Sequence, residues 1–84
     1  MTSAPSRLKR PRHPMPGFVQ QALEARSLTT AYEGRPPYQR NDYIGWIMRA
    51  ATEETQLKRL EQMLDELRRG DVYMKMAWRP PGQR

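Results

Sequence analysis

The sequence contains no cysteine and only one histidine among its 84 residues. Without cysteine, disulfide bridges and thiolate metal sites are excluded, and nothing points to an oxidising compartment. A single histidine leaves almost no option for a zinc site, a haem site or His-based catalysis. We therefore expect no metal and no cofactor.

Long apolar runs are also missing. No stretch approaches the ~20 apolar residues that a membrane helix needs. The N-terminus is charged, but no apolar core follows it, which is not the pattern of a secretory signal. We expect a soluble, cytoplasmic protein with no membrane span.

Catalytic motifs are missing as well. The sequence has no glycine-rich phosphate loop, no HExxH and no Ser–His or Cys–His arrangement. Neighbouring carboxylates such as Glu53 and Glu54 are typical of solvated helix turns rather than acid/base pairs. We predict no catalytic residue and a protein that is not an enzyme. The minor alternative is an enzyme fragment whose active site needs another domain.

The surplus positive charge lies at the two ends of the chain. The formal net charge is +6, but residues 17–78 contain nine basic and nine acidic side chains. The six surplus basic residues are Arg7, Lys9, Arg10, Arg12, Arg79 and Arg84. This distribution argues against a basic nucleic-acid groove on the folded part.

Residues 1–16 have the composition of an arm rather than of a packed element. They contain four prolines, four basic residues and no acid. Because proline interrupts helices and like charges repel, we predict a disordered basic arm in which His13 is solvated. The arm is either a solubilising tail or a weak binder of phosphates or anionic lipid.

The strongest helix signal runs from Thr52 to Gly70. Thr52 suits the N-cap, and the two glutamates that follow it offset the helix dipole. Gly70 suits the residue of positive φ that ends a helix. Apolar residues recur at steps of three and four along one face. This apolar stripe comprises Leu57, Leu60, Met63, Leu64 and Leu67.

Three shorter helical patterns precede this helix. Residues 16–26 and 27–34 predict two short helices, the second capped by Ser27 or Thr29. Residues 37–51 predict a longer helix, which only one or two residues join to the next one. So short a connection predicts that the two longer helices meet at an angle.

The helix predicted for residues 37–51 has one apolar face. We expect Trp46 to dominate the core by packing this face on the leucine stripe. Asn41 and Gly45 face away from it, and glycine costs about 1 kcal/mol relative to alanine in a helix interior. The predicted core residues are Tyr43, Trp46, Ile47, Leu57, Leu60, Leu64 and Leu67.

These elements predict an all-α protein, a small orthogonal bundle of three to four helices over residues 17–71. A disordered arm (residues 1–16) precedes it and an extended segment with a tail (residues 72–84) follows. We find no second strand to pair with residues 72–78, so we expect this segment to lie across the helices with Trp78 in an apolar notch. The alternative is pairing with a second subunit, which predicts a monomer or a weak homodimer through residues 72–78.

The helix from Thr52 also has a polar face that packing does not require. This face is either ordinary solvated surface or a contact surface for another protein. A DNA-reading helix is disfavoured, because the acidic side chains of this helix would repel phosphate. The predicted partner-binding residues are Arg40, Thr55, Arg59, Gln62 and Glu66.

A set of positions from Pro36 to Gly70 keeps a familiar spacing without a gap. These positions are Pro36, Pro37, Arg40, Tyr43, Ile44, Gly45, Trp46, Ile47, Ala50, Thr55, Arg59, Leu60, Leu67 and Gly70. The set resembles the bacteriocin-protection family called YdeI or OmpD-associated (OmdA-like). The chain departs from the family at four positions, namely Tyr38, Gln39, Ala51 and Gln56.

The resemblance implies a small helical domain linked to resistance toward bacteriocins and cationic peptides, without an implied catalytic chemistry. We therefore expect a non-enzymatic bacterial protein that acts through contacts with a protein partner, whose identity is unknown. The alternative is weak binding of nucleic acid or of an anionic surface through the basic arm.

Overall fold

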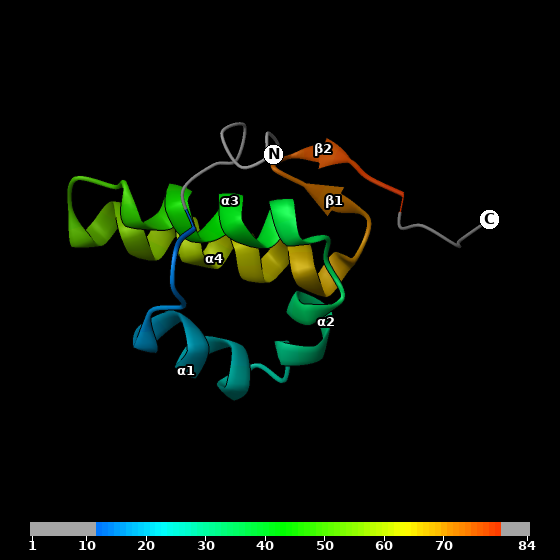
Figure 1. The fold of residues 1–84 in the computed structure, drawn as a ribbon, viewed down its shortest axis with the longest axis horizontal. Helices are drawn as coiled ribbons and strands as arrows, with labels where there is room; N and C mark the ends of the chain where they lie inside the picture. Colours follow the sequence, from blue (N-terminus) through cyan, green and yellow to red (C-terminus); the bar gives the residue numbers. More distant parts are fainter. Residues whose placement is uncertain (1–11, 80–84) are drawn as a thin grey trace, which may run out of the picture.

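Helices make up most of the described part of the chain, which comprises residues 12–79 of this computed structural model (Figure 1). The elements in chain order are α1 (Gly17–Ala25), α2 (Thr29–Glu33), α3 (Pro37–Met48), α4 (Glu53–Arg69), β1 (Val72–Tyr73) and β2 (Met76–Ala77). In Figure 1, α3 and α4 run in opposite directions, with α1 and α2 along one side and the strands on the other. None of the described helices is long and apolar enough to cross a lipid bilayer.

The mostly helical class that the sequence predicts is confirmed, and a small sheet is added to it. The orthogonal arrangement of the helices is not confirmed. Most of the predicted arm (residues 1–11) and the end of the C-terminal tail (residues 80–84) lie outside the described part of the chain.

Both ends of α4 agree with the sequence prediction. The Thr52 hydroxyl accepts a hydrogen bond from the backbone N–H of Thr55 at 3.2 Å, so Thr52 is the N-cap. Gly70 has a φ of 85°, and its N–H donates to the carbonyl of Glu66. A left-handed glycine in this position satisfies a carbonyl at the end of the helix.

The core lies where α1, α2, α3 and α4 meet. Its members are Val19, Leu23, Tyr32, Tyr43, Ile44, Ile47, Leu60, Met63, Leu64 and Leu67. Tyr43, rather than Trp46, is the largest fully buried side chain. Trp46 is only partly buried at the edge of the core, where the guanidinium of Arg59 lies 5.3 Å from the centre of its ring. The expectation that Trp46 dominates the core is therefore wrong.

Leu57 is the predicted core residue that the structure places at the surface, with 48% of its area exposed. α3 ends at Met48 rather than at residue 51, and residues 49–52, not one or two, connect it to α4. Leu57 is in the second turn of α4 and lies with Phe18 and Gln56 in an open depression at this end of the molecule. Met48, the last residue of α3, contacts Gln56 beside it, so α3 reaches this level of α4 but leaves Leu57 exposed.

The short helices α1 and α2 form close to where the sequence predicts them. Val19 and Leu23 of α1 are buried. The N-cap of α2 is Leu28, without a side-chain hydrogen bond, so the predicted capping by Ser27 or Thr29 is wrong. Ser27 instead turns the chain between the helices with a φ of 58°.

The chain after Gly70 forms a β-hairpin, which the sequence analysis missed. β1 and β2 pair antiparallel, with Val72 opposite Ala77 and Tyr73 opposite Met76. The two residues between them have positive φ, 51° at Met74 and 65° at Lys75. Positive φ at both central residues is typical of the tight turns that connect hairpin strands.

The different exposure of two leucines on α4 can be tested by stability. We expect Leu64→Ala, at a site that is 1% exposed, to lower the free energy of unfolding by about 2–5 kcal/mol, since it leaves a cavity. We expect Leu57→Ala to cost at most about 1 kcal/mol. The measurement is urea unfolding of both variants. Equal costs at the two positions would contradict the placement of Leu57.

Candidate functional site

Glu66, which the sequence places on an exposed face, is buried, with 3% of its area exposed. Its carboxylate accepts hydrogen bonds from the hydroxyl of Tyr43 at 2.5 Å and from the amide of Gln62 at 3.0 Å. It also accepts hydrogen bonds from the backbone N–H groups of Met74 at 2.8 Å and of Lys75 at 2.9 Å. The hairpin turn therefore covers Glu66, and the expectation that this side chain faces solvent is wrong.

Arg35 lies beside this carboxylate and is itself buried, with 4% of its area exposed. Its guanidinium donates to the side-chain oxygen of Gln39 and to the backbone carbonyl of Glu66, both at 3.0 Å. The ring of Trp78 lies against the same guanidinium, 4.6 Å from ring centre to Cζ. The sequence predicts that Trp78 fills an apolar notch, but its ring instead packs against the guanidinium of Arg35.

Tyr43 is the member of this network whose pKa is shifted by its surroundings. Burial, the hydrogen bond to Glu66 and the negative charge of that carboxylate all raise the pKa of Tyr43 above the usual value for tyrosine, and the nearby Arg35 partly offsets the rise. The phenol stays protonated at neutral pH and acts as a fixed donor. These contacts connect α3, α4 and the hairpin, which is a structural role.

Two other predicted partner-binding residues also make contacts within the chain. Arg59 donates to the backbone carbonyl of Trp46 at 2.6 Å, near the end of α3. Thr55 bonds to the N-cap Thr52 through both its N–H and its hydroxyl. The structure brings Gln62 and Glu66 together but places Thr55 and Arg59 elsewhere along α4, and Arg40 on α3. A partner-binding role for the five remains a prediction.

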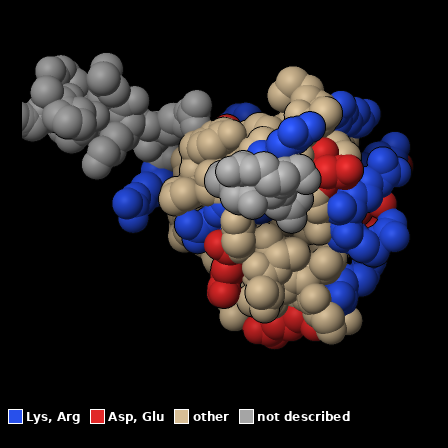
Figure 2. All heavy atoms as spheres, turned by 90° about the vertical axis from the view of Figure 1, so that its right-hand side faces the viewer, with Lys and Arg blue, Asp and Glu red and all other residues tan. Residues whose placement is uncertain are grey.

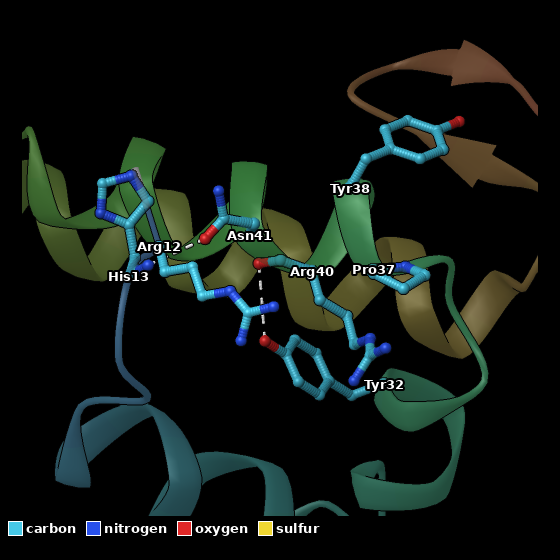
Figure 3. A pocket seen from close by; sticks show the side chains of 7 residues that line it. All are labelled: Arg12, His13, Tyr32, Pro37, Tyr38, Arg40 and Asn41. Carbon is cyan, nitrogen blue, oxygen red and sulfur yellow. Dashed lines mark hydrogen bonds between the residues drawn. The ribbon is translucent and has the colours of Figure 1, made fainter. Parts of the chain in front are cut away.

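Arg40 lies in a cleft that collects polar side chains from three segments (Figure 3). The cleft is open and has a volume of about 550 Å³. We name it the cationic cleft. Its lining residues are Arg12 and His13 from the N-terminal segment (residues 12–16), Tyr32 from α2, and Pro37, Tyr38, Arg40 and Asn41 from α3.

Hydrogen bonds hold the walls of the cationic cleft together. The Tyr32 hydroxyl donates to the backbone carbonyl of Arg40 at 3.5 Å, which connects α2 to α3. The Nε of Arg40 donates to the carbonyl of Arg35 at 3.1 Å. Burial raises the pKa of Tyr32, although the charge of Arg40 lowers it, so this phenol is a donor at neutral pH.

The N-terminal segment closes one side of the cationic cleft. The backbone N–H of His13 donates to Oδ1 of Asn41 at 2.8 Å, a contact between residues 28 positions apart. His13 is half-buried against α3, so the expectation that it is solvated is wrong. Asn41, expected to face away from the apolar face of its helix, is half-buried and serves as the acceptor.

The donors of the cationic cleft suit an anionic group. Neither the guanidinium of Arg12 nor that of Arg40 forms an ion pair with a carboxylate within residues 12–79. Guanidinium groups present planar donor pairs that match carboxylate and phosphate oxygens. Within the same residues, no group of three His, Asp or Glu side chains is arranged to hold a metal ion.

The folded part of the chain carries charges of both signs. Figure 2 shows Lys and Arg side chains close to Asp and Glu side chains and to uncharged surface on the face that it displays. The balance of nine basic and nine acidic residues in residues 17–78 agrees with this mixed surface.

Comparison with known proteins gives one match. A family model described as bacteriocin-protection, YdeI or OmpD-associated matches residues 13–70. The match begins in the N-terminal segment and ends at the C-cap of α4, so it includes most of the cationic cleft and excludes the hairpin. No curated protein and no solved structure matches the chain significantly.

The raised pKa of Tyr43 predicts a loss of stability at alkaline pH. In the unfolded chain a tyrosine loses its proton near pH 10, whereas folded Tyr43 keeps it. Above pH ~10 the unfolded state therefore binds fewer protons than the folded state. The contribution of Tyr43 to the free energy of unfolding is complete below pH ~10 and falls by at most about 1.4 kcal/mol per pH unit above it.

Urea unfolding at a series of alkaline pH values tests this, with Tyr43→Phe as the control. We expect the wild-type protein to be more stable than the variant at neutral pH, because the variant lacks the hydrogen bond to Glu66, and we expect the difference to shrink as the pH rises above ~10. A difference that stays constant would contradict the account.

Proposed function

The chain belongs to the bacteriocin-protection, YdeI or OmpD-associated family, and on this basis we propose that it is a non-enzymatic protein-interaction module in bacterial tolerance of bacteriocins or cationic peptides. Its action is binding of a protein partner rather than chemical change of a substrate. The proposed contact site is the cationic cleft. Arg40 is the predicted partner-binding residue that lines this cleft.

The observation that carries this proposal is the pair of guanidiniums in an open cleft. Arg12 and Arg40 come from different segments and line one cleft; in Figure 3 the Arg12 guanidinium lies near the hydroxyl of Tyr32 and the Arg40 guanidinium near the other end of the same ring. Arginine is favoured at contact surfaces because it combines charge with directed hydrogen bonds. By contrast, the buried charges of Glu66 and Arg35 are occupied in holding the fold.

The charge of the chain favours an indirect role in tolerance. A formal net charge of +6 repels a cationic peptide, so capture of the peptide by this protein is disfavoured. A cationic cleft instead favours an anionic group on a partner protein. The proposed place of action is the cytoplasm, where such a partner would be part of the response to the peptide.

Binding of nucleic acid or of an anionic surface through the basic arm is the second candidate. Its support is that Arg12, the last basic residue of the arm, lines the cleft. The balanced charge of residues 17–78 provides no row of cations along which a chain of phosphates could lie. We therefore rank partner-protein binding first.

A survival assay tests the proposed function. A host strain lacking the gene is challenged with a cationic peptide and complemented with the wild-type chain, Arg40→Gln or Lys58→Gln. We expect the wild-type chain to restore survival and Arg40→Gln to fail, because the variant removes a charge from the cleft. Lys58→Gln should restore survival, since Lys58 is a surface residue of α4 with 77% of its side chain exposed.

Immunoblots and thermal unfolding ensure that the variants accumulate and fold. If loss of the gene leaves survival unchanged, the role in tolerance is wrong. If Arg40→Gln restores survival as well as the wild type does, the cationic cleft is not the contact site.

A further inference from the structure

The contact between His13 and Gly45 suggests how the cationic cleft is assembled. A Cβ atom on Gly45 would lie 2.6 Å from Nε2 of His13 and 2.8 Å from its Cδ2, closer than side-chain atoms approach one another. The imidazole therefore packs on the bare backbone of α3, in space that any other residue at position 45 would occupy. This contact gives a physical reason for glycine in the interior of a helix, where it is otherwise unfavourable.

The same contact positions the residue before it. His13 is held by its ring on Gly45 and by its N–H on Asn41, one helical turn away on the same side of α3. Arg12 is exposed and directly precedes this anchored residue, and its guanidinium lies over the cleft near the Tyr32 hydroxyl (Figure 3). The orientation of Arg12 therefore depends on the packing of the His13 ring against Gly45.

Arg40 supplies the second cation from a fixed position. Its Nε is bonded to the carbonyl of Arg35, which orients the guanidinium. Within residues 12–79 its two terminal nitrogens make no hydrogen bond. Neither cation has an acidic partner among residues 12–79, and two such cations that line one cleft favour an anionic ligand there.

The other walls of the cleft favour a peptide as the source of the anion. Pro37 and Tyr38 contribute apolar surface, and 48% of the area of Tyr38 is exposed. A peptide segment with carboxylate and aliphatic side chains can contact the cations and this surface together. A nucleic acid would need a longer row of cations than the cleft offers.

We propose that the cationic cleft binds a carboxylate-bearing peptide segment through Arg12 and Arg40. In this proposal Gly45 is a positioning residue, because the His13 ring packs against it and thereby orients Arg12. The inference rests on the proposed function, because it names the chemistry of the partner at the same site. It also makes the N-terminal segment a part of that site.

Fluorescence anisotropy with the full chain tests the ligand. The probe is a fluorescein-labelled peptide of alternating Glu and Leu, and the comparison probes are the same peptide with Gln for Glu and a ten-nucleotide single-stranded DNA. We expect the Glu peptide to bind more tightly than either. We expect Arg12→Gln and Arg40→Gln each to weaken its binding about fivefold, the contribution of one exposed charge pair. Lys58→Gln should leave binding unchanged.

Gly45→Ala tests the positioning role. The added methyl group displaces the His13 ring, so we expect the same weakening as in Arg12→Gln and no further loss when the two substitutions are combined. The His13 imidazole proton resonances should move to those of a solvated histidine. Gly17→Ala is the matched control, because a Cβ at Gly17 meets no atom within 4 Å.

Each contrary outcome overturns a stated part of the inference. Absent binding of the Glu peptide, or equal binding of the Gln peptide, would overturn the carboxylate site. Binding of the DNA that is as tight and as dependent on Arg40 would overturn the peptide as its ligand. Unchanged affinity in Gly45→Ala would overturn the role of Gly45. None of these results decides the survival assay, which uses the natural partner, so the two proposals fail separately.

Discussion

The rest of the structure depends on the hydrogen bonds that the buried carboxylate of Glu66 accepts. Removing a carboxylate from water costs several kcal/mol unless hydrogen bonds replace the water. Here Tyr43 supplies one from α3, Gln62 one from α4, and the backbone of Met74 and Lys75 two from the hairpin. A hairpin with strands of two residues is too short to be stable alone, so this carboxylate accounts for its position on the helices.

The same network reaches the cationic cleft. The guanidinium of Arg35 is bonded to the backbone of Glu66, and the carbonyl of Arg35 accepts the Nε of Arg40. The start of α3 is thereby fixed to α4 and also carries the cation that faces the cleft. The fold thus holds one wall of the proposed site rigid, while the N-terminal segment, which brings Arg12, is held by the contacts of His13.

The sequence predicts well what depends on local pattern and poorly what depends on distant backbone groups. The caps of α4 and the burial of Leu60, Leu64 and Leu67 follow from residue type and helical period. The sequence places Glu66 at the surface, because it shows no partner for a charged residue on a polar helix face. The hairpin has no signal in the sequence, because Met74 and Lys75 are not the asparagine and glycine that such turns favour. Of the cationic cleft the sequence predicts only Arg40, because His13 and Asn41 meet across 28 positions. The glycine in the interior of α3 is the one signal of that contact.

The stability of Glu66→Ala, compared with Glu61→Ala on the exposed side of α4, tests the central claim most directly. Glu66→Ala leaves the buried Tyr43 hydroxyl without an acceptor and removes the acceptor of two partly buried backbone N–H groups, so we expect a loss of at least about 3 kcal/mol in the free energy of unfolding. The amides of Met74 and Lys75 should also lose their protection from hydrogen exchange. Glu61→Ala should cost less than about 1 kcal/mol, because it removes only the exposed ion pair with Arg26. Similar small losses in the two variants, with both amides still protected, would contradict the account.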